Sequence, residues 1–254
     1  PRSRRFTALE RMDVEGDVLT PLDEDGVRAL VPAIRASGAT AVAVAFLHSY
    51  ANPAHERRVR EILEEAAPEL AVSLSCEVCP EIREYERTST TVANAYVQPL
   101  MAGYLRRLEA AAAERGCRAP LRLMTSGGRL AGVDTACRFP VRLVESGPAG
   151  GAILAAHVAA SRAEDKVLSF DMGGTTAKIC LIEKGEPLSA RTFEVDRSAR
   201  FMKGSGFPLR IPVIEMIEIG AGGGSIARLD ATRSIAGGPS PGPPATAAAG
   251  PGRR

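Results

Sequence analysis

Residue types suited to binding phosphate gather in a short turn between two apolar runs, at 167–170 and 179–182. Glycines let a backbone pass close to a ligand, and successive backbone N–H groups of such a turn can hold an anion. A carboxylate at the end of the first run could hold a hydrated Mg²⁺ or orient a water molecule. The turn contains Asp171, Gly173, Gly174, Thr175 and Thr176. This pattern predicts a strand–turn–strand phosphate site, with an ordinary glycine hairpin as the alternative.

A second glycine turn follows a predicted strand at 121–124 and contains Ser126, Gly127 and Gly128. The carboxyl ends of strands are where open α/β sheets place ligands. We therefore predict a ligand-facing turn here, with a plain turn as an equal alternative.

Two further glycine segments lie before and after the first turn in the sequence. One joins a predicted strand at 141–145 to a small-residue helix at 152–161, and a strand-to-helix junction of this kind suits phosphate because it offers free N–H groups and a helix dipole. The other follows an apolar predicted strand at 211–219 and leaves room for a flat group such as adenine or ribose. Their alternatives are a packing segment and a flexible loop. The residues concerned are Ser146, Gly147, Gly150, Gly220, Gly222, Gly223, Gly224 and Ser225.

Helix and strand patterns alternate in the first part of the chain, which predicts an α/β fold. The expected order is a hairpin (6–12 and 18–19), a helix (21–38), a strand (40–47), a helix after Pro53 and a strand (70–74). A long helix is expected at 91–115, and Pro99 should kink or divide it.

Composition excludes several classes of protein. The chain has 254 residues, 45% of them hydrophobic, and a formal net charge of +2, so no basic stripe indicates a nucleic-acid binder. Apolar runs such as 39–47 are too short to span a bilayer. Five scattered cysteines indicate reduced thiols and a cytoplasmic protein, and the lone pair Cys76 and Cys79 does not predict a zinc site.

Three segments taken together resemble the hydantoinase A / oxoprolinase family, which includes a subunit of acetone carboxylase. They are 146–151 (Ser-Gly-Pro-Ala-Gly-Gly), 171–178 (Asp-Met-Gly-Gly-Thr-Thr-Ala-Lys) and 219–227 (Ile-Gly-Ala-Gly-Gly-Gly-Ser-Ile-Ala). The segments 46–53, 87–91 and 94–96 are also similar to that family. The likeness covers about residues 1 to 230.

The resemblance implies the actin-like ATPase fold of actin, sugar kinases and heat-shock chaperones, with ATP and Mg²⁺ as cofactors. It implies that Asp171 orients a metal-bound water or nucleophile and that 173–176 bind phosphate. Lys178 would reach phosphate, or point to solvent or a carboxylate instead. The turn at 126–128 would lie on the substrate side, and 220–225 would face the nucleoside.

The reaction implied is ATP-dependent opening of a cyclic amide, after phosphorylation of its carbonyl oxygen. The alternatives are a ketone carboxylase subunit, a non-catalytic nucleotide-binding module, or an inactive truncated product. The expected partners are a small cyclic amide or ketone and a second family subunit or domain, with no nucleic acid and no membrane.

The resemblance also suggests a division of the chain and an internal fragment, because the family's first phosphate turn has no counterpart here. Residues 1–88 match the end of an N-terminal domain, and 89–230 match the start of the hydantoinase A/oxoprolinase domain. The tail at 231–254 is rich in Gly, Pro and Ala and is expected to be disordered. The family segment Pro-Ala-Cys-Tyr-Gly-Arg-Gly-Gly-Pro can be coded by a DNA string that, read one nucleotide later, gives residues 243–251. A reading-frame shift is therefore expected between about residues 230 and 238, with a natural linker as the alternative, and the coding DNA decides between them.

Overall fold

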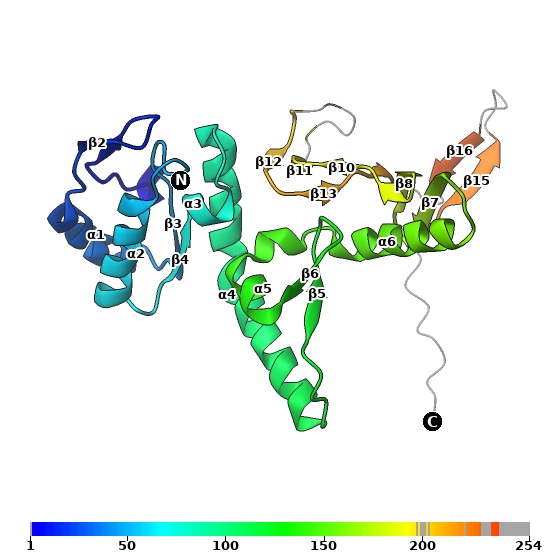
Figure 1. Cartoon of the computed structure of the whole chain (residues 1–254), viewed down its shortest axis with the longest axis horizontal. Helices are drawn as coiled ribbons and strands as arrows, with labels where there is room; N and C mark the ends of the chain where they lie inside the picture. Colours follow the sequence, from blue (N-terminus) through cyan, green and yellow to red (C-terminus); the bar gives the residue numbers. More distant parts are fainter. Residues whose placement is uncertain are drawn as a thin grey trace. The chain divides into compact units, whose positions relative to one another are not determined.

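The computed structural model describes residues 2–196, 198, 202, 204–220, 222–229 and 235–238. These residues form a mixed α/β structure of two compact units (Figure 1). The first unit contains 1–153 and 189–214, and the second contains 154–188 and 215–254. Most of the predicted tail lies outside the described residues, but residues 235–238 form a paired strand, so the expectation of disorder is wrong there.

The first unit begins with the predicted alternation of helices and strands. Asp23 caps the first helix by accepting a hydrogen bond from the Gly26 N–H at 2.9 Å, as expected for an N-cap residue. Two parallel strands, β3 and β4, flank helix α2 in a βαβ unit, and Val31, Ile62 and Leu74 belong to the core beneath them. The elements are η1 (Arg2–Arg4), β1 (Arg11–Met12), β2 (Val18–Thr20), α1 (Glu24–Ala36), β3 (Ala41–Val44), α2 (Ala54–Ala66) and β4 (Ala71–Leu74).

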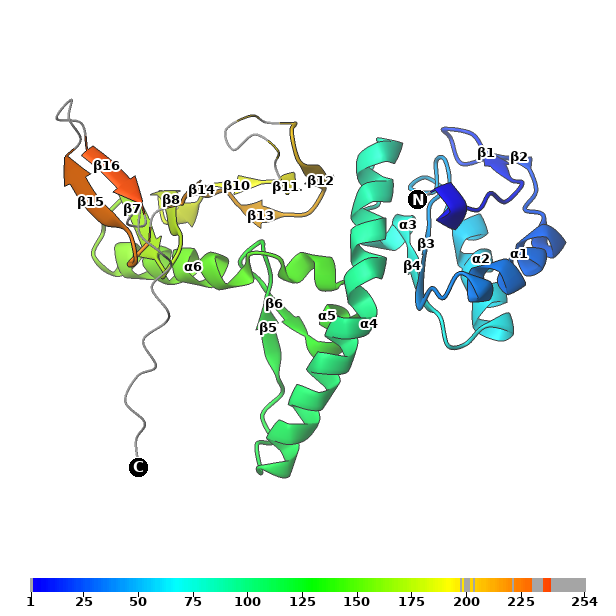
Figure 2. The ribbon, with the colours of Figure 1, turned by 180° about the vertical axis from the view of Figure 1, so that it is seen from behind.

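The long helix α4 (Glu84–Glu114) follows the short helix α3 (Ser75–Val78) and contacts β3, β4 and the later segments of its unit. It begins seven residues before the predicted start and contains Pro99 as a single helix (Figure 2). Of the two expected effects of Pro99, a kink or a division, the division is therefore wrong. A proline removes a single helical hydrogen bond, and the tertiary contacts on either side hold the helix together.

A hairpin and two short helices pack against α4. Strands β5 (Arg122–Met124) and β6 (Leu130–Gly132) are antiparallel, and α5 (Val133–Arg138) packs on Leu105. Neither β6 nor α5 was predicted. The strand expected at 141–145 is instead the 3₁₀ helix η2 (Pro140–Leu143). Asn94 holds this segment on α4, because its side chain donates to the Arg138 carbonyl and accepts from the Val141 N–H.

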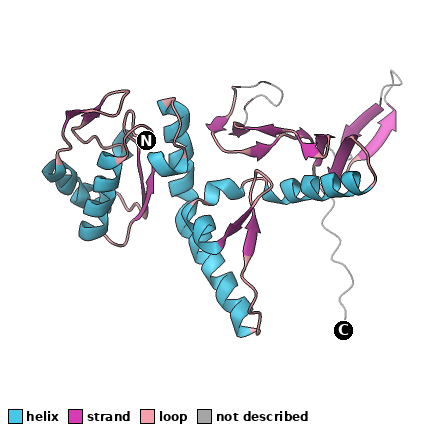
Figure 3. Cartoon of the chain, viewed as in Figure 1, coloured by secondary structure: helices cyan, strands magenta, loops and turns pink. Residues whose placement is uncertain are grey.

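The expected strand at 211–219 is two strands that pair with different partners (Figure 3). In the first unit, β10 (Ser189–Ala190) pairs with β13 (Val213–Ile214), and β11 (Phe193–Val195) pairs with β12 (Phe207–Leu209). In the second unit, β14 (Ile217–Ile219) pairs with β8. The chain changes sheet at Glu215, which an apolar pattern alone does not reveal.

The second unit is built on the predicted hairpin of β7 (Lys166–Met172) and β8 (Ala177–Glu183). The sheet order is β14, β8, β7, with β9 (Glu186–Pro187) pairing with β8, and a separate hairpin joins β15 (Ile226–Leu229) to β16 (Ile235–Gly238). Helix α6 (Ser146–Ser161) starts in the first unit and continues into the second. No helix in the described part of the chain is long and apolar enough to cross a membrane.

Candidate functional site

The strand–turn–strand pattern around Asp171 is present as predicted. Asp171 is the penultimate residue of β7, and a hydrogen bond of 3.0 Å from the Gly173 N–H to the Thr176 carbonyl closes the turn. Asp171, Gly173, Gly174 and Thr175 are exposed, and Thr176 is half-buried. The turn therefore presents one carboxylate, two hydroxyls and several backbone N–H groups to solvent.

The glycine run lies directly on this turn. The Gly223 N–H donates to the Gly173 carbonyl at 2.9 Å, and the Gly224 N–H donates to the Gly174 carbonyl at 3.3 Å. The run has its own closed turn, in which the Ser225 N–H donates to the Gly222 carbonyl and the Ser225 Oγ accepts from the Gly222 N–H at 3.1 Å. Two segments about 50 residues apart in the sequence thus form one backbone-built surface.

Gly222 is a glycine because the two backbones approach closely. A Cβ on Gly222 would lie 2.5 Å from the Gly174 carbonyl carbon and 2.6 Å from the Thr175 nitrogen. A Cβ on Gly223 or Gly224 would meet nothing closer than 3.6 Å. The sequence interpretation gave all the glycines of this run to a nucleoside, whereas the structure gives Gly222 a packing reason.

The turn retains donors that could hold an anion. The N–H groups of Gly174 and Thr175 have no backbone or side-chain acceptor among the residues described here. A Cβ added to Gly174 would meet nothing within 4 Å, so the backbone is open on that side. Open N–H groups on successive residues are the feature that makes a turn an anion site.

A row of three charged residues crosses the sheet beside the turn. Asp171 on β7 lies opposite Lys178 on β8, and Lys178 lies opposite Glu218 on β14. Directly opposite residues of antiparallel strands share a face of the sheet. The Lys178 Nζ is 3.9 Å from the Glu218 Oε1. The sequence left three contacts open for the Lys178 side chain: phosphate, solvent or a carboxylate. The structure shows the carboxylate contact. Sequence reasoning missed Glu218, although a carboxylate in so apolar a stretch was a signal.

The described residues contain no group of three or more His, Cys, Asp or Glu side chains that could cage a metal ion. Mg²⁺ does not require such a cage, since it keeps several waters and binds through one or two carboxylates and the phosphates of its substrate. One exposed carboxylate beside open N–H groups fits that donor set, so Asp171 is compatible with Mg²⁺ held through water.

The segment of Ser146, Gly147 and Gly150 differs from the prediction. It is the start of helix α6, and no strand precedes it, so it is not a glycine junction between a strand and a helix. Gly150 lies inside the helix, where its N–H is not free for a ligand. Ser146 and Gly147 lie in the first turn, and Glu145 before them has a φ of 58°. Their role in nucleotide binding stays a prediction.

The turn of Ser126, Gly127 and Gly128 joins two antiparallel strands, so the expected open-sheet location is wrong. Gly128 has a φ of 74°, and a Cβ there would lie 2.8 Å from Ile153 Cδ1. The Ser126 hydroxyl donates to the Pro212 carbonyl at 2.8 Å, and its N–H donates to the Arg142 carbonyl. Ser126 is therefore buried and positions the turn.

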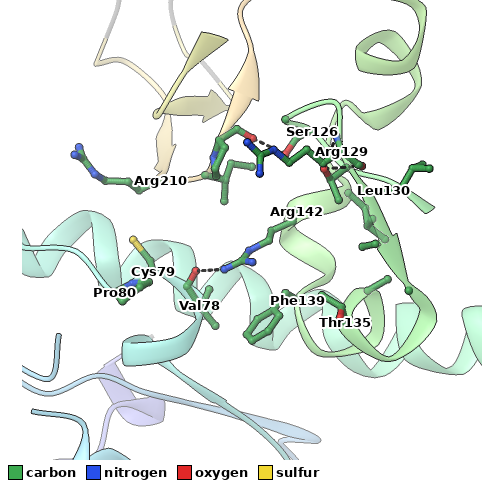
Figure 4. A pocket seen from close by; sticks show the side chains of 18 of the residues that line it. Val78, Cys79, Pro80, Ser126, Arg129, Leu130, Thr135, Phe139, Arg142 and Arg210 are labelled. Atoms are coloured by element: carbon green, nitrogen blue, oxygen red, sulfur yellow. Dashed lines mark hydrogen bonds between the residues drawn. The ribbon is translucent and has the colours of Figure 1, made fainter. Parts of the chain in front are cut away.

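This turn lines a cavity within the first unit (Figure 4). It has a volume of about 680 Å³, in the range of about 300–1,000 Å³ typical of small-molecule sites. Ser126 and Gly127 line it, with Gly128 just outside. Its charged lining residues, which sequence reasoning missed, are Glu81, Arg129, Arg142 and Arg210.

The described residues define a mixed α/β protein with a candidate anion site built from backbone groups. The chain belongs to the hydantoinase/oxoprolinase family: the family pattern matches residues 87–252, and the pattern of the family's N-terminal region matches residues 1–67. The match over residues 87–252 extends past residue 230, where the motifs recognised in the sequence end.

Two relatives and two solved structures give the scale of the similarity. The chain is 39% identical to an uncharacterized protein of Methanocaldococcus jannaschii over 94% of this chain and 35% of that one. It is 36% identical to the caprolactamase alpha subunit of Pseudomonas jessenii over 91% of this chain and 32% of that one. The crystal structure of that ATP-dependent caprolactamase matches with a TM-score of 0.77 over 94% of this chain and 33% of that chain. Nucleotide-free acetone carboxylase matches with 31% identity and a TM-score of 0.71 over 91% of this chain and 32% of that chain. The chain therefore spans about a third of the length of these relatives.

Proposed function

We propose that this chain is part of an ATP-dependent hydrolase that opens a cyclic amide. The observation that carries the proposal is the packing of the 222–225 turn on the 173–176 turn, with Asp171 beside them. Relatives named caprolactamase and 5-oxoprolinase support the substrate class. The fold proposed is the actin-like ATPase fold, with the turn at 171–178 as its second phosphate turn.

The residues of this chain would act by positioning and charge. The N–H groups of Gly174 and Thr175 and the hydroxyls of Thr175 and Thr176 would bind phosphate oxygens. Asp171 would orient a water held by Mg²⁺, and Lys178 would balance charge between Asp171 and Glu218. ATP supplies the phosphoryl group that turns a carbonyl oxygen into a leaving group. In phosphoryl transfer, positioning and electrostatic stabilisation account for most of the protein's contribution.

A second candidate is a ketone carboxylase subunit. The acetone carboxylase beta subunit of Xanthobacter autotrophicus is 31% identical over 94% of this chain and 32% of its own length. The same turn would serve either reaction, since caprolactamase and acetone carboxylation are both described as ATP-dependent. Several relatives are named as subunits, so we also propose a partner subunit.

The test is ATP hydrolysis by the full-length protein that the gene encodes, with a hydantoin, 5-oxoproline, caprolactam or acetone as the stimulating substrate. Asp171→Asn keeps the shape of the side chain and removes its charge, and it should abolish the stimulated rate. Asp165→Asn, an exposed aspartate just before β7, is the matched control and should keep it. An unchanged rate in Asp171→Asn, with normal folding, would exclude this role. Stimulation by acetone alone would favour the carboxylase.

A further inference from the structure

The cavity of the first unit carries an excess of positive charge. Three guanidinium groups, from Arg129, Arg142 and Arg210, line it against the single carboxylate of Glu81. Arg210 is paired with that carboxylate through its Nε, and the pair raises the pKa of Arg210. The remaining two guanidiniums have no carboxylate partner in the part of the chain that the structure describes.

Arg142 is held by its surroundings and keeps its donors available. Its guanidinium stacks over the Phe139 ring at 4.7 Å from the centroid. Its Nη2 makes only long hydrogen bonds, of 3.4 Å to the Val78 carbonyl and 3.5 Å to the Glu77 carbonyl. Figure 4 shows this side chain reaching across to Val78. Burial lowers the pKa of Arg142, but an arginine stays a cation in proteins.

Arg129 supplies the second unpaired charge. It follows the turn of Ser126, Gly127 and Gly128, and its backbone closes that turn through two hydrogen bonds with the Thr125 hydroxyl and one from the Thr125 N–H. Its side chain is exposed at the cavity. A guanidinium presents a planar fork of N–H donors that matches the two oxygens of a carboxylate.

The rest of the lining is mainly apolar or uncharged. The apolar side chains are Val78, Leu130, Ala131, Ala136, Phe139, Leu143 and Ile211. Inorganic phosphate would leave this surface unused, whereas a carboxylate on a small apolar body would use both parts. Burial and the nearby Glu81 raise the pKa of the lining thiol of Cys79 to about 11. Cys79 is therefore a neutral wall of the cavity at neutral pH and not a competing anion.

We propose that this cavity binds a small organic carboxylate, with Arg142 and Arg129 on the carboxylate and the apolar wall on its body. The inference adds a class of ligand to the predicted position of residues 126–128 on the substrate side. The role of this ligand as a substrate rests on the proposed function, whereas its binding to the cavity does not.

Binding is measured by ligand-observed NMR or calorimetry without nucleotide, so a failed ATPase proposal leaves the result intact. The probes are cyclopentanecarboxylate, its uncharged amide and inorganic phosphate. The carboxylate should bind best. Arg142→Gln and Arg129→Gln should each weaken it about tenfold or more, since each removes a charge-assisted hydrogen bond, with little effect on the amide. Arg142→Lys should recover part of the loss.

Arg107→Gln removes an equally exposed arginine of α4 outside the cavity and should change nothing. Thermal unfolding of each variant separates lost binding from lost folding, and the exposed Arg129 keeps the test valid should Arg142→Gln unfold the protein. Equal binding of the carboxylate and the amide would overturn the inference. So would phosphate binding as tight as carboxylate binding, or unchanged carboxylate binding in folded Arg129→Gln.

Discussion

The two units present ligand groups in different ways. In the first unit, guanidinium side chains line the cavity, and buried polar side chains fix the segments that carry them. In the second unit, backbone N–H groups form the candidate phosphate turn, and glycines bring the two backbones together. All the fully buried polar or charged residues among those described lie in the first unit.

The interior of the first unit contains a buried network of charge and hydroxyl groups. Glu56 is 0% exposed and accepts from the Phe46 and Cys76 N–H groups, both at 2.9 Å, and from the Ser75 hydroxyl at 2.6 Å. Arg87, which is 1% exposed, donates to the same Ser75 oxygen and to the Phe46 carbonyl. The network joins α2, the start of α3 and α4, so it positions the cavity wall that follows β4.

The sheet of the second unit has an exposed apolar face. Leu168, Phe170 and Met172 alternate along β7 and are 57%, 56% and 54% exposed. The site face of the same strand carries Asp171. The candidate turn of the second unit therefore has little buried polar structure around it, whereas the cavity of the first unit lies in a unit that contains such structure.

The largest effect should come from breaking the buried network. Glu56→Ala leaves two N–H groups and the Ser75 hydroxyl without their acceptor and removes the carboxylate that this hydroxyl connects to Arg87. It should cost about 3 kcal/mol of unfolding free energy. Glu64→Ala on the exposed side of the same helix is the control. Chemical denaturation measures both. Equal midpoints would mean that the first unit does not depend on this network.

A smaller and local effect is expected in the second unit from Gly222→Ala. The added Cβ must push the two turns apart, at a typical overpacking cost of about 1–3 kcal/mol, so ATP affinity of the full-length protein should fall about tenfold. Amide exchange at Gly223 should also speed up, which tests the packing without nucleotide. Gly224→Ala is the control for the packing, because its Cβ lies 3.6 Å from the Gly174 carbonyl oxygen. Identical behaviour of the two variants would contradict the packing role of Gly222.

The free energy of unfolding should depend on pH through Glu77 in the first unit. Burial alone would raise the pKa of Glu77, but hydrogen bonds from Arg60 and Arg138 outweigh it and hold the pKa below 4.5. A depressed carboxyl pKa stabilises the fold above the unfolded value, and this contribution is lost as pH falls through the folded value. Glu77→Gln should therefore cost about 1 kcal/mol near neutral pH. Denaturation at a series of pH values should show the gap to wild type closing below about pH 4.5. If the difference in unfolding free energy between Glu77→Gln and wild type stays constant with pH, the ionised pair is not its cause.

The smallest effect is a difference in thiol reactivity. Burial raises the pKa of Cys76 to about 12 and that of Cys79 to about 11, while Cys117 is exposed. Iodoacetamide near neutral pH should label Cys117 first, and Cys76 and Cys79 only slowly. Mass spectrometry of digests gives the order, and labelling in denaturant gives the reference. Fast labelling of Cys79 in the folded protein would contradict the burial of its thiol in the cavity wall.

The sequence by itself determined the family, the βαβ start of the chain and the strand–turn–strand around Asp171. Those features depend on local patterns: apolar periodicity, an N-cap at Asp23, and glycines that a backbone site requires. Glycine and threonine residues can be read directly from the sequence, so the turn of the second unit could be found without coordinates.

Only the tertiary structure decided which segments meet. It placed Gly222 on Gly174, set Glu218 beside Lys178, divided 211–219 between two sheets and gathered Arg129, Arg142 and Arg210 around one cavity. Single arginines far apart in sequence carry no pattern of their own, because exposed arginines are common and their role depends on what they face. Helix α4 continues through Pro99 for the same reason: contacts distant in sequence outweighed a local preference.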